Sequence, residues 1–136
     1  MSNIVQVINA EKNMTVLKKS VMASGLSNVL TGTGPFTVFA PSDSAFEKLQ
    51  NGVVESLLKP ENKARLADLL NDHIVAGKVN FKDLKDGANL KTLNGKQLHV
   101  SVKDGHVSVQ GAEVLNYDRS SSNGVLHSLD AVIIRN

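Results

Sequence analysis

The sequence predicts an α+β protein, because two hydrophobic periodicities divide it near Gly77. Before Gly77 the apolar residues recur at spacings of three and four positions, which is the period of an amphipathic helix. After Gly77 apolar and polar residues alternate, as they do in a strand with one buried face. The chain has 136 residues and no cysteine, a length at which a core can form without disulfides. We expect a single domain over residues 1–136.

The first predicted helix begins at Thr15, a candidate N-cap, and ends at Gly25, a candidate C-terminal stop. Its apolar positions recur near helical spacing and comprise Val16, Leu17, Val21 and Met22. A short apolar turn is expected next, through Leu26, Val29 and Leu30 to Gly32.

A β-prone run at residues 36–40 lies between Pro35 and Pro41 and predicts a buried strand. A helix is expected directly after this strand, because residues 42–47 offer N-cap side chains and because Ser44 and Glu47 have the spacing of a capping box. This helix should end before Gly52.

Two more helices are expected before the alternating half of the chain. One begins at Val53 and stops near Pro60, where proline interrupts helical hydrogen bonding. The other starts near Asn62, and its apolar face contains Leu66, Leu69, Leu70 and Ile74.

The clearest β signal is a hairpin in which residues 98–103 and 106–110 flank Asp104 and Gly105. An Asp-Gly loop favours a type I′ turn, because both positions accept positive φ. In that register the polar residues share one face and the apolar residues share the other. Asn94-Gly95 indicates a second turn with a bulge or longer loop, and residues 125–134 are expected to form one or two strands.

Composition argues against several classes of function. Fifteen Lys and Arg residues oppose thirteen Asp and Glu residues, and no basic stripe or set of aromatic platforms indicates nucleic-acid binding. Apolar runs are too short to predict a membrane span. Residues 1–6 lack the basic start and apolar stretch of a secretory signal, which indicates either a cytoplasmic protein or a trimmed form.

The histidines of the predicted hairpin do not indicate a metal site. His99 and His106 share a face of the hairpin. His106 pairs with Lys103, which is four positions along the same strand from His99, so the two histidines should lie about 13 Å apart. That separation is too large for two ligands of one zinc ion. We expect both to be surface histidines.

Catalytic motifs are also poorly supported. His127, Ser128 and Asp130 are the residue types of a hydrolase triad, but in a strand His127 and Ser128 point to opposite faces. His127 is therefore predicted to be buried and hydrogen-bonded to a fixed partner.

The glycine-containing segment at residues 32–35 is not followed by the Lys-Ser/Thr pair of a phosphate loop, so we expect a turn there. Asp72 beside His73 is typical of a helix cap or a local ion pair. We expect no catalytic residue, cofactor or metal.

Two long runs resemble the signatures of the fasciclin-like domain family. Residues 34–46, Gly-Pro-Phe-Thr-Val-Phe-Ala-Pro-Ser-Asp-Ser-Ala-Phe, resemble the first signature, and residues 123–132, Asn-Gly-Val-Leu-His-Ser-Leu-Asp-Ala-Val, resemble the second. Residues 54–62 and 73–79 fit the family pattern between them. The resemblance implies an α+β module in which helices pack against an antiparallel β-wedge or sandwich. It also implies that the most recognisable signature residues are mainly structural: Thr37, Phe39, Pro41, Asp43, Phe46, Asn123, Gly124, His127 and Asp130.

The resemblance further implies a noncatalytic module for cell adhesion, attached to a protein or glycan at a cell surface or in matrix and located outside the cytoplasm. In animal members, receptor binding is associated with a Tyr-His pair and an Asp-Ile pair. The corresponding positions here are Asp72-His73 and Asp118-Arg119, so these four residues are candidate adhesion contacts. The tetrapeptide at residues 129–132 resembles a short integrin-binding sequence, but a structural role is favoured because it lies within the second signature.

One hypothesis concerns the packing of the signatures, and another concerns an alternative function. The first is that His127 hydrogen-bonds to Ser42 or Asp43 and so connects the two signatures. The second is that the chain carries a small apolar ligand between the helices and the β-wedge.

Overall fold

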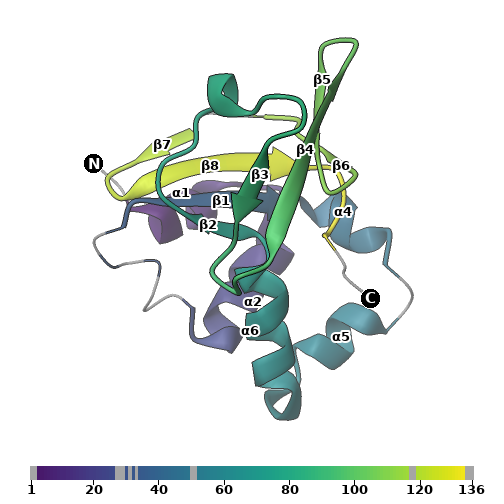
Figure 1. Ribbon diagram of the computed structural model, residues 1–136. Helices are drawn as coiled ribbons and strands as arrows, with labels where there is room; N and C mark the ends of the chain where they lie inside the picture. The colour runs from purple at the N-terminus through teal and green to yellow at the C-terminus, as the bar shows by residue number, and fades with distance from the viewer. Residues whose placement is uncertain are drawn as a thin grey trace.

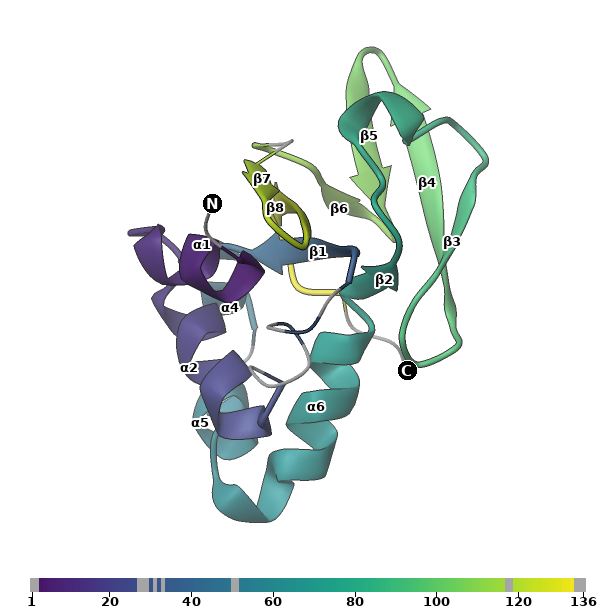
Figure 2. The ribbon, with the colours of Figure 1, turned by 90° about the vertical axis from the view of Figure 1, so that its left-hand side faces the viewer.

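The computed structural model describes residues 3–26, 30, 32, 34–49, 52–116 and 119–133. These residues form three layers, in which a central sheet lies between a group of helices and a second sheet (Figures 1 and 2). The predicted α+β class, with helices packed on a β-sandwich, is confirmed.

The helical layer contains five α-helices and a short 3₁₀ helix within the described residues: α1 (Ile4–Ala10), α2 (Thr15–Ser24), α4 (Asp43–Glu47), α5 (Val53–Leu57), η1 (Pro60–Asn62) and α6 (Lys63–Asn71). The helix α1 was not predicted from the apolar pattern. Its local signal is a capping box, because the Asn3 and Gln6 side chains each accept a hydrogen bond from the other residue's backbone N–H at 2.9 Å.

The predicted helix boundaries are correct at several points and wrong at others. Gly25 ends α2 in the left-handed region at φ 80°, as predicted. Ser44 does not begin a helix, because Ser42 is the N-cap of α4 and accepts a hydrogen bond from the backbone N–H of Ala45. Ile74 lies in a strand rather than on the face of α6. The predicted turn through Leu26 and Leu30 falls partly outside the described residues.

The central sheet has the order β2-β1-β8-β7, with β1 (Phe36–Pro41), β2 (Ile74–Ala76), β7 (Arg119–Ser121) and β8 (Gly124–Leu129). Strands β1 and β8 run parallel, with Phe39 opposite His127, while the other pairs are antiparallel. This pairing places the two signature segments side by side in the middle of the sheet (Figure 1).

The second sheet has the order β3-β4-β5-β6, with β3 (Asn89–Lys91), β4 (Gln97–Lys103), β5 (His106–Val109) and β6 (Ala112–Glu113); the short 3₁₀ helix η2 (Phe81–Asp83) precedes it. Lys103 pairs with His106 across Asp104 and Gly105, whose φ values are 52° and 81°. The predicted hairpin and register are confirmed, because positive φ at both loop positions matches the twist of the strands.

Two hydrophobic clusters explain why β1 and β8 are buried on both faces. Val38, Ala40 and Leu126 pack with the helices, whereas Phe39 and Leu129 pack with the second sheet. Among the described residues, no helix is long and apolar enough to cross a membrane.

Candidate functional site

His127 occupies a buried position between the central and second sheets. Its side chain is 0% exposed, and its ring stacks on Phe39 with 5.5 Å between the ring centroids. The Nε2 atom lies 2.7 Å from the carbonyl oxygen of Val79. The predicted burial is confirmed, and this ring nitrogen has the Val79 carbonyl as a fixed partner. A hydrogen bond from His127 to Ser42 or Asp43 stays a prediction. The parallel register places His127 beside Phe39.

Two polar residues of the first signature, Thr37 and Asp43, make long-range hydrogen bonds. The Thr37 hydroxyl donates to the Gly77 carbonyl at 2.7 Å and accepts from the Val79 backbone N–H at 2.8 Å. The Asp43 carboxylate accepts from the Thr15 hydroxyl and from the backbone N–H of Val16. The prediction of Thr15 as the N-cap of α2 is wrong, because the N-cap is Met14, whose side chain accepts no capping hydrogen bond. Asp43 in α4 accepts the hydrogen bond from the Val16 N–H instead.

The second signature connects the N-terminal helix to the central sheet. Asn123 accepts a hydrogen bond from the Ile4 backbone N–H at 2.9 Å and donates from its amide to the carbonyls of Leu30 and Gly32. Gly124 faces Phe36 so closely that a Cβ atom would lie 1.9 Å from the Phe36 carbonyl oxygen.

The ends of the two signatures are held by different parts of the protein. Pro41 pairs with Leu129 at the end of the parallel ladder, and Phe46 is buried in the helical core. The Asp130 carboxylate accepts a hydrogen bond from the Glu113 backbone N–H at 2.8 Å, which joins the end of β8 to β6. These signature residues therefore make contacts within the protein, although the Asp130 side chain is partly exposed.

The candidate adhesion contacts Asp72 and His73 lie in the interior, with 5% and 2% of their surfaces exposed. Asp72 is the C-cap residue of α6, and its carboxylate accepts a hydrogen bond from the Asn94 side chain at 3.2 Å. His73 Nε2 accepts from the Ile133 backbone N–H at 2.9 Å, while Nδ1 lies 2.8 Å from the Leu69 carbonyl oxygen. This burial opposes direct contact of either side chain with a macromolecule.

Arg119, from the other candidate pair, lies at the opposite edge of the central sheet. Asp118 is outside the described residues. Arg119 begins β7, whose neighbour on one side is β8, and its guanidinium forms an ion pair with Glu11. Because β1 and β8 separate β7 from β2, the structure does not bring Arg119 together with His73.

The polar face of the second sheet has ordinary surface contacts. His106 Nδ1 lies 3.3 Å from a Glu113 carboxylate oxygen, and His99 lies near Asn89. Within the described ranges, no group of three or more His, Cys, Asp or Glu residues could hold a metal ion.

Ser128, one of the three residue types of a hydrolase triad, accepts a hydrogen bond from the Asn116 backbone N–H, on the opposite side of β8 from His127.

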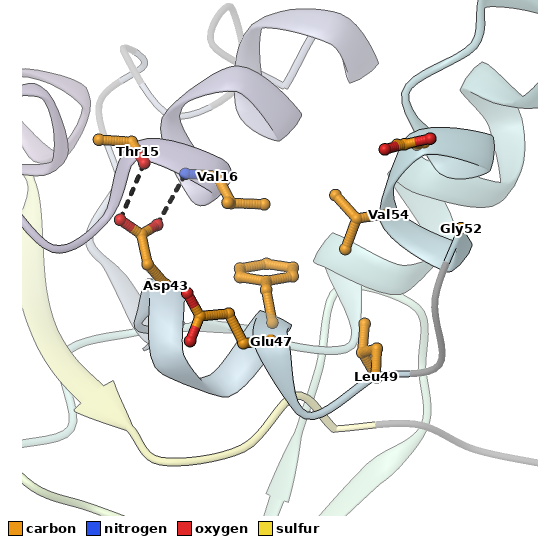
Figure 3. A pocket seen from close by; sticks show the side chains of 9 residues that line it. Thr15, Val16, Asp43, Glu47, Leu49, Gly52 and Val54 are labelled. Carbon is orange, nitrogen blue, oxygen red and sulfur yellow. Dashed lines mark hydrogen bonds between the residues drawn. The ribbon is translucent and has the colours of Figure 1, made fainter.

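A groove of about 440 Å³ lies on the helical layer, between the start of α2, α4 and α5. Its apolar lining consists of Val16, Phe46, Leu49 and Val54, and its acidic lining consists of Asp43, Glu47 and Glu55. Figure 3 shows Val16 and Val54 pointing toward one another across the groove, with Leu49 at one end. The groove was not predicted, because its lining residues come from three helices whose relative positions the sequence pattern does not define.

A second hollow of about 310 Å³ lies on the other side of α5, toward α6, and includes Val53, Leu57 and Leu69. At the junction of the first helices with β7 and β8, a hollow lined by Met14 and Leu126 has a volume of only about 30 Å³. That volume is close to the space of one or two water molecules. The hollows of about 440 and 310 Å³ lie among the helices, whereas the carrier hypothesis requires space between the helices and the sheet.

Comparisons with known proteins agree with this architecture. The Fasciclin domain family matches residues 12–135. Protein sll1483 of Synechocystis sp. is 43% identical over 131 residues, covering 96% of this chain and 72% of that protein. Transforming growth factor-beta-induced protein ig-h3 of Sus scrofa is 36% identical over 135 residues, covering 98% of this chain but 19% of that protein.

A solved structure of a FAS1 domain pair from the insect cell adhesion molecule fasciclin I has the same fold. It superposes with a TM-score of 0.88 at 18% identity, covering 98% of this chain and 51% of that chain. With the order of the two signatures and the three-layer arrangement, these matches identify the family. The chain belongs to the fasciclin domain family.

Proposed function

We propose that residues 1–136 form a single noncatalytic adhesion module that binds a protein or glycan partner at a cell surface or in matrix. Family membership supports this proposal, as does the adhesion molecule that shares the fold. Location outside the cytoplasm, whether extracellular, periplasmic or on the cell surface, is part of the same proposal.

The observation that carries the proposal is that side chains of the two signatures form hydrogen bonds within the protein. Asn123, His127 and Asp43 make hydrogen bonds to distant backbone groups inside the protein. Buried hydrogen bonds of this kind hold the helices and sheets in one arrangement. The signatures therefore support a rigid body that presents its outer surface, including the groove of about 440 Å³ on the helical layer. A binding module needs such a surface.

A direct test is to coat the purified chain on a surface and measure attachment of cells, together with binding to panels of matrix proteins and glycans. The control is an unrelated cysteine-free protein of similar size coated at the same density. We expect saturable binding to at least one partner. Absence of binding to cells, matrix proteins and glycans would contradict the proposal, whereas a lipid-sized mass retained in native mass spectrometry would favour a carrier.

A further inference from the structure

Among the residues that the structure describes, the lining of the groove between α2, α4 and α5 contains carboxylates but no basic side chain. Its acidic residues differ in their contacts. Asp43 uses both carboxylate oxygens internally, because one accepts from the Thr15 hydroxyl and the other from the Val16 backbone N–H (Figure 3). The carboxylates available to a ligand are therefore those of Glu47 and Glu55, which are exposed.

No described cation neutralises these two carboxylates. Within the described part of the chain, Lys48 forms an ion pair with Asp130 and Arg119 forms one with Glu11, while His106 contacts Glu113. Lys48 follows Glu47 in the chain, but its ammonium group donates to the Asp130 backbone carbonyl at 2.6 Å. The adjacent positive charge is thus directed toward the end of β8, away from the groove.

Between these carboxylates the groove offers apolar surface. Phe46 is 4% exposed and belongs to the helical core, while Val16, Leu49 and Val54 are half-buried and pack at the edge of that core. Apolar surface of this kind gains free energy when a ligand removes it from water. A volume of about 440 Å³ falls within the usual range of ligand-binding pockets.

We propose that this groove binds a basic and apolar peptide segment of a partner protein, in which Lys or Arg residues flank large apolar side chains. The apolar side chains would cover Val16, Leu49 and Val54, and the basic groups would lie against Glu47 and Glu55. Complementary charge selects a basic partner over an acidic one. A peptide matches the groove better than a lone amine. The apolar lining of the groove is contributed by α2, by α4 with the residues after it and by α5, and an amine without apolar side chains would leave that lining uncovered. This inference rests on the proposed function as a binding module.

The test uses three short peptides as probes, each acetylated at the N-terminus and amidated at the C-terminus. They are Lys-Leu-Phe-Lys, its acidic counterpart Glu-Leu-Phe-Glu, and its polar counterpart Lys-Ser-Gly-Lys. Each is titrated into ¹⁵N-labelled protein while backbone amide shifts are recorded. We expect saturable shifts near Val16, Leu49 and Val54 with the first peptide, and much weaker shifts with the other two. Added salt should weaken binding, because the charges are exposed.

Matched variants separate charge from apolar contact. Glu47→Gln and Glu55→Gln should each weaken binding of the first peptide about two- to fivefold, whereas Glu61→Gln on η1, outside the groove, should not. Val54→Thr should also weaken binding, in contrast to Val102→Thr on the second sheet. Each glutamine is nearly isosteric with the exposed glutamate that it replaces, so the fold should be retained.

Several results would overturn the inference: no saturable shifts with the basic and apolar peptide, shifts elsewhere on the surface, or equal binding of the acidic peptide. Pentylamine binding as tightly as the peptide would identify a small cation as the ligand instead. The adhesion assay distinguishes the two proposals. If the protein attaches to cells or matrix and the glutamine variants attach equally well, the groove inference fails while the adhesion proposal stands. If no partner is bound in any assay, the adhesion proposal fails too.

Discussion

The carboxylate of Asp43 accepts a hydrogen bond from the backbone N–H of Val16 at 2.9 Å, although the two residues are 27 positions apart in the chain. Val16 is in the first turn of α2, and the helix has no side-chain cap from its own N-cap residue, Met14. Because the first N–H groups of a helix lack partners within the helix, Asp43 supplies an acceptor that the local sequence does not. One carboxylate thus joins α4 to α2.

Asp43→Ala should reduce the free energy of unfolding by about 1–2 kcal/mol, because helix caps of this kind contribute about that amount. Asp43→Asn should cost less, since the amide oxygen can still accept one hydrogen bond. Urea unfolding followed by far-UV circular dichroism measures both changes. Ser44→Ala, at an exposed position in the same helix, is the control. An Asp43→Ala protein with the unfolding midpoint of the wild type would show that the cap contributes no stability.

Gly124→Ala should prevent stable folding. The added Cβ atom would lie 1.9 Å from the Phe36 carbonyl oxygen, and strands β1 and β8 would have to separate to accommodate it. We expect a loss of more than about 4 kcal/mol, which exceeds the usual range for single substitutions. Soluble yield and thermal melting followed by circular dichroism provide the measurement.

The control for this substitution is Gly95→Ala, because a Cβ atom there meets no neighbouring atom within 4 Å. Gly95 has φ 81°, so alanine would be strained by about 1–2 kcal/mol without a steric clash. If both variants were destabilised equally, the close approach of β1 and β8 at Gly124 would not be the cause.

His127→Ala should reduce the free energy of unfolding by about 2–4 kcal/mol, through the cavity that it leaves and the loss of the hydrogen bond to Val79. The stacking of the His127 ring on Phe39 would also be lost. Thermal melting compares this variant with His106→Ala, whose side chain is exposed on the second sheet. A His127→Ala melting temperature equal to that of the wild type would refute the structural role of His127.

The hydrogen bonds of His73 predict its tautomer. Because Nε2 accepts from the Ile133 backbone N–H, the neutral ring must carry its proton on Nδ1, which donates to the Leu69 carbonyl. Long-range ¹H–¹⁵N correlation spectra distinguish the two nitrogens. We expect a protonated Nδ1 and an unprotonated Nε2 for His73. A ring protonated on Nε2 would be incompatible with the observed contact to Ile133.

Much of the fold follows from patterns between neighbouring residues. The hairpin over Asp104 and Gly105 could be predicted because turn geometry depends on the two loop residues and on strict alternation beside them. The strand at residues 36–40 and the end of α2 at Gly25 were predictable for similar local reasons. The ordered signatures likewise indicated the family.

The candidate contacts show where local patterns fail. Asp72 and His73 are polar residues at a helix end, which normally indicates exposure, yet both are buried. Their hydrogen-bond partners include Asn94 and Ile133, which lie 22 and 60 positions farther along the chain. The sequence pattern contains no signal for such partners, because they are defined by how the turn between β3 and β4 and the segment after β8 pack near the end of α6.

The sequence by itself determined the helical and alternating halves, the hairpin register and the family of this protein, because each depends on the order of nearby residues. Only the tertiary structure decided that Asp43 caps α2, that His127 bonds to Val79, and that three helices enclose an acidic groove. The physical reason is that a buried polar group requires a partner within hydrogen-bonding distance, and long-range packing determines which group occupies that position.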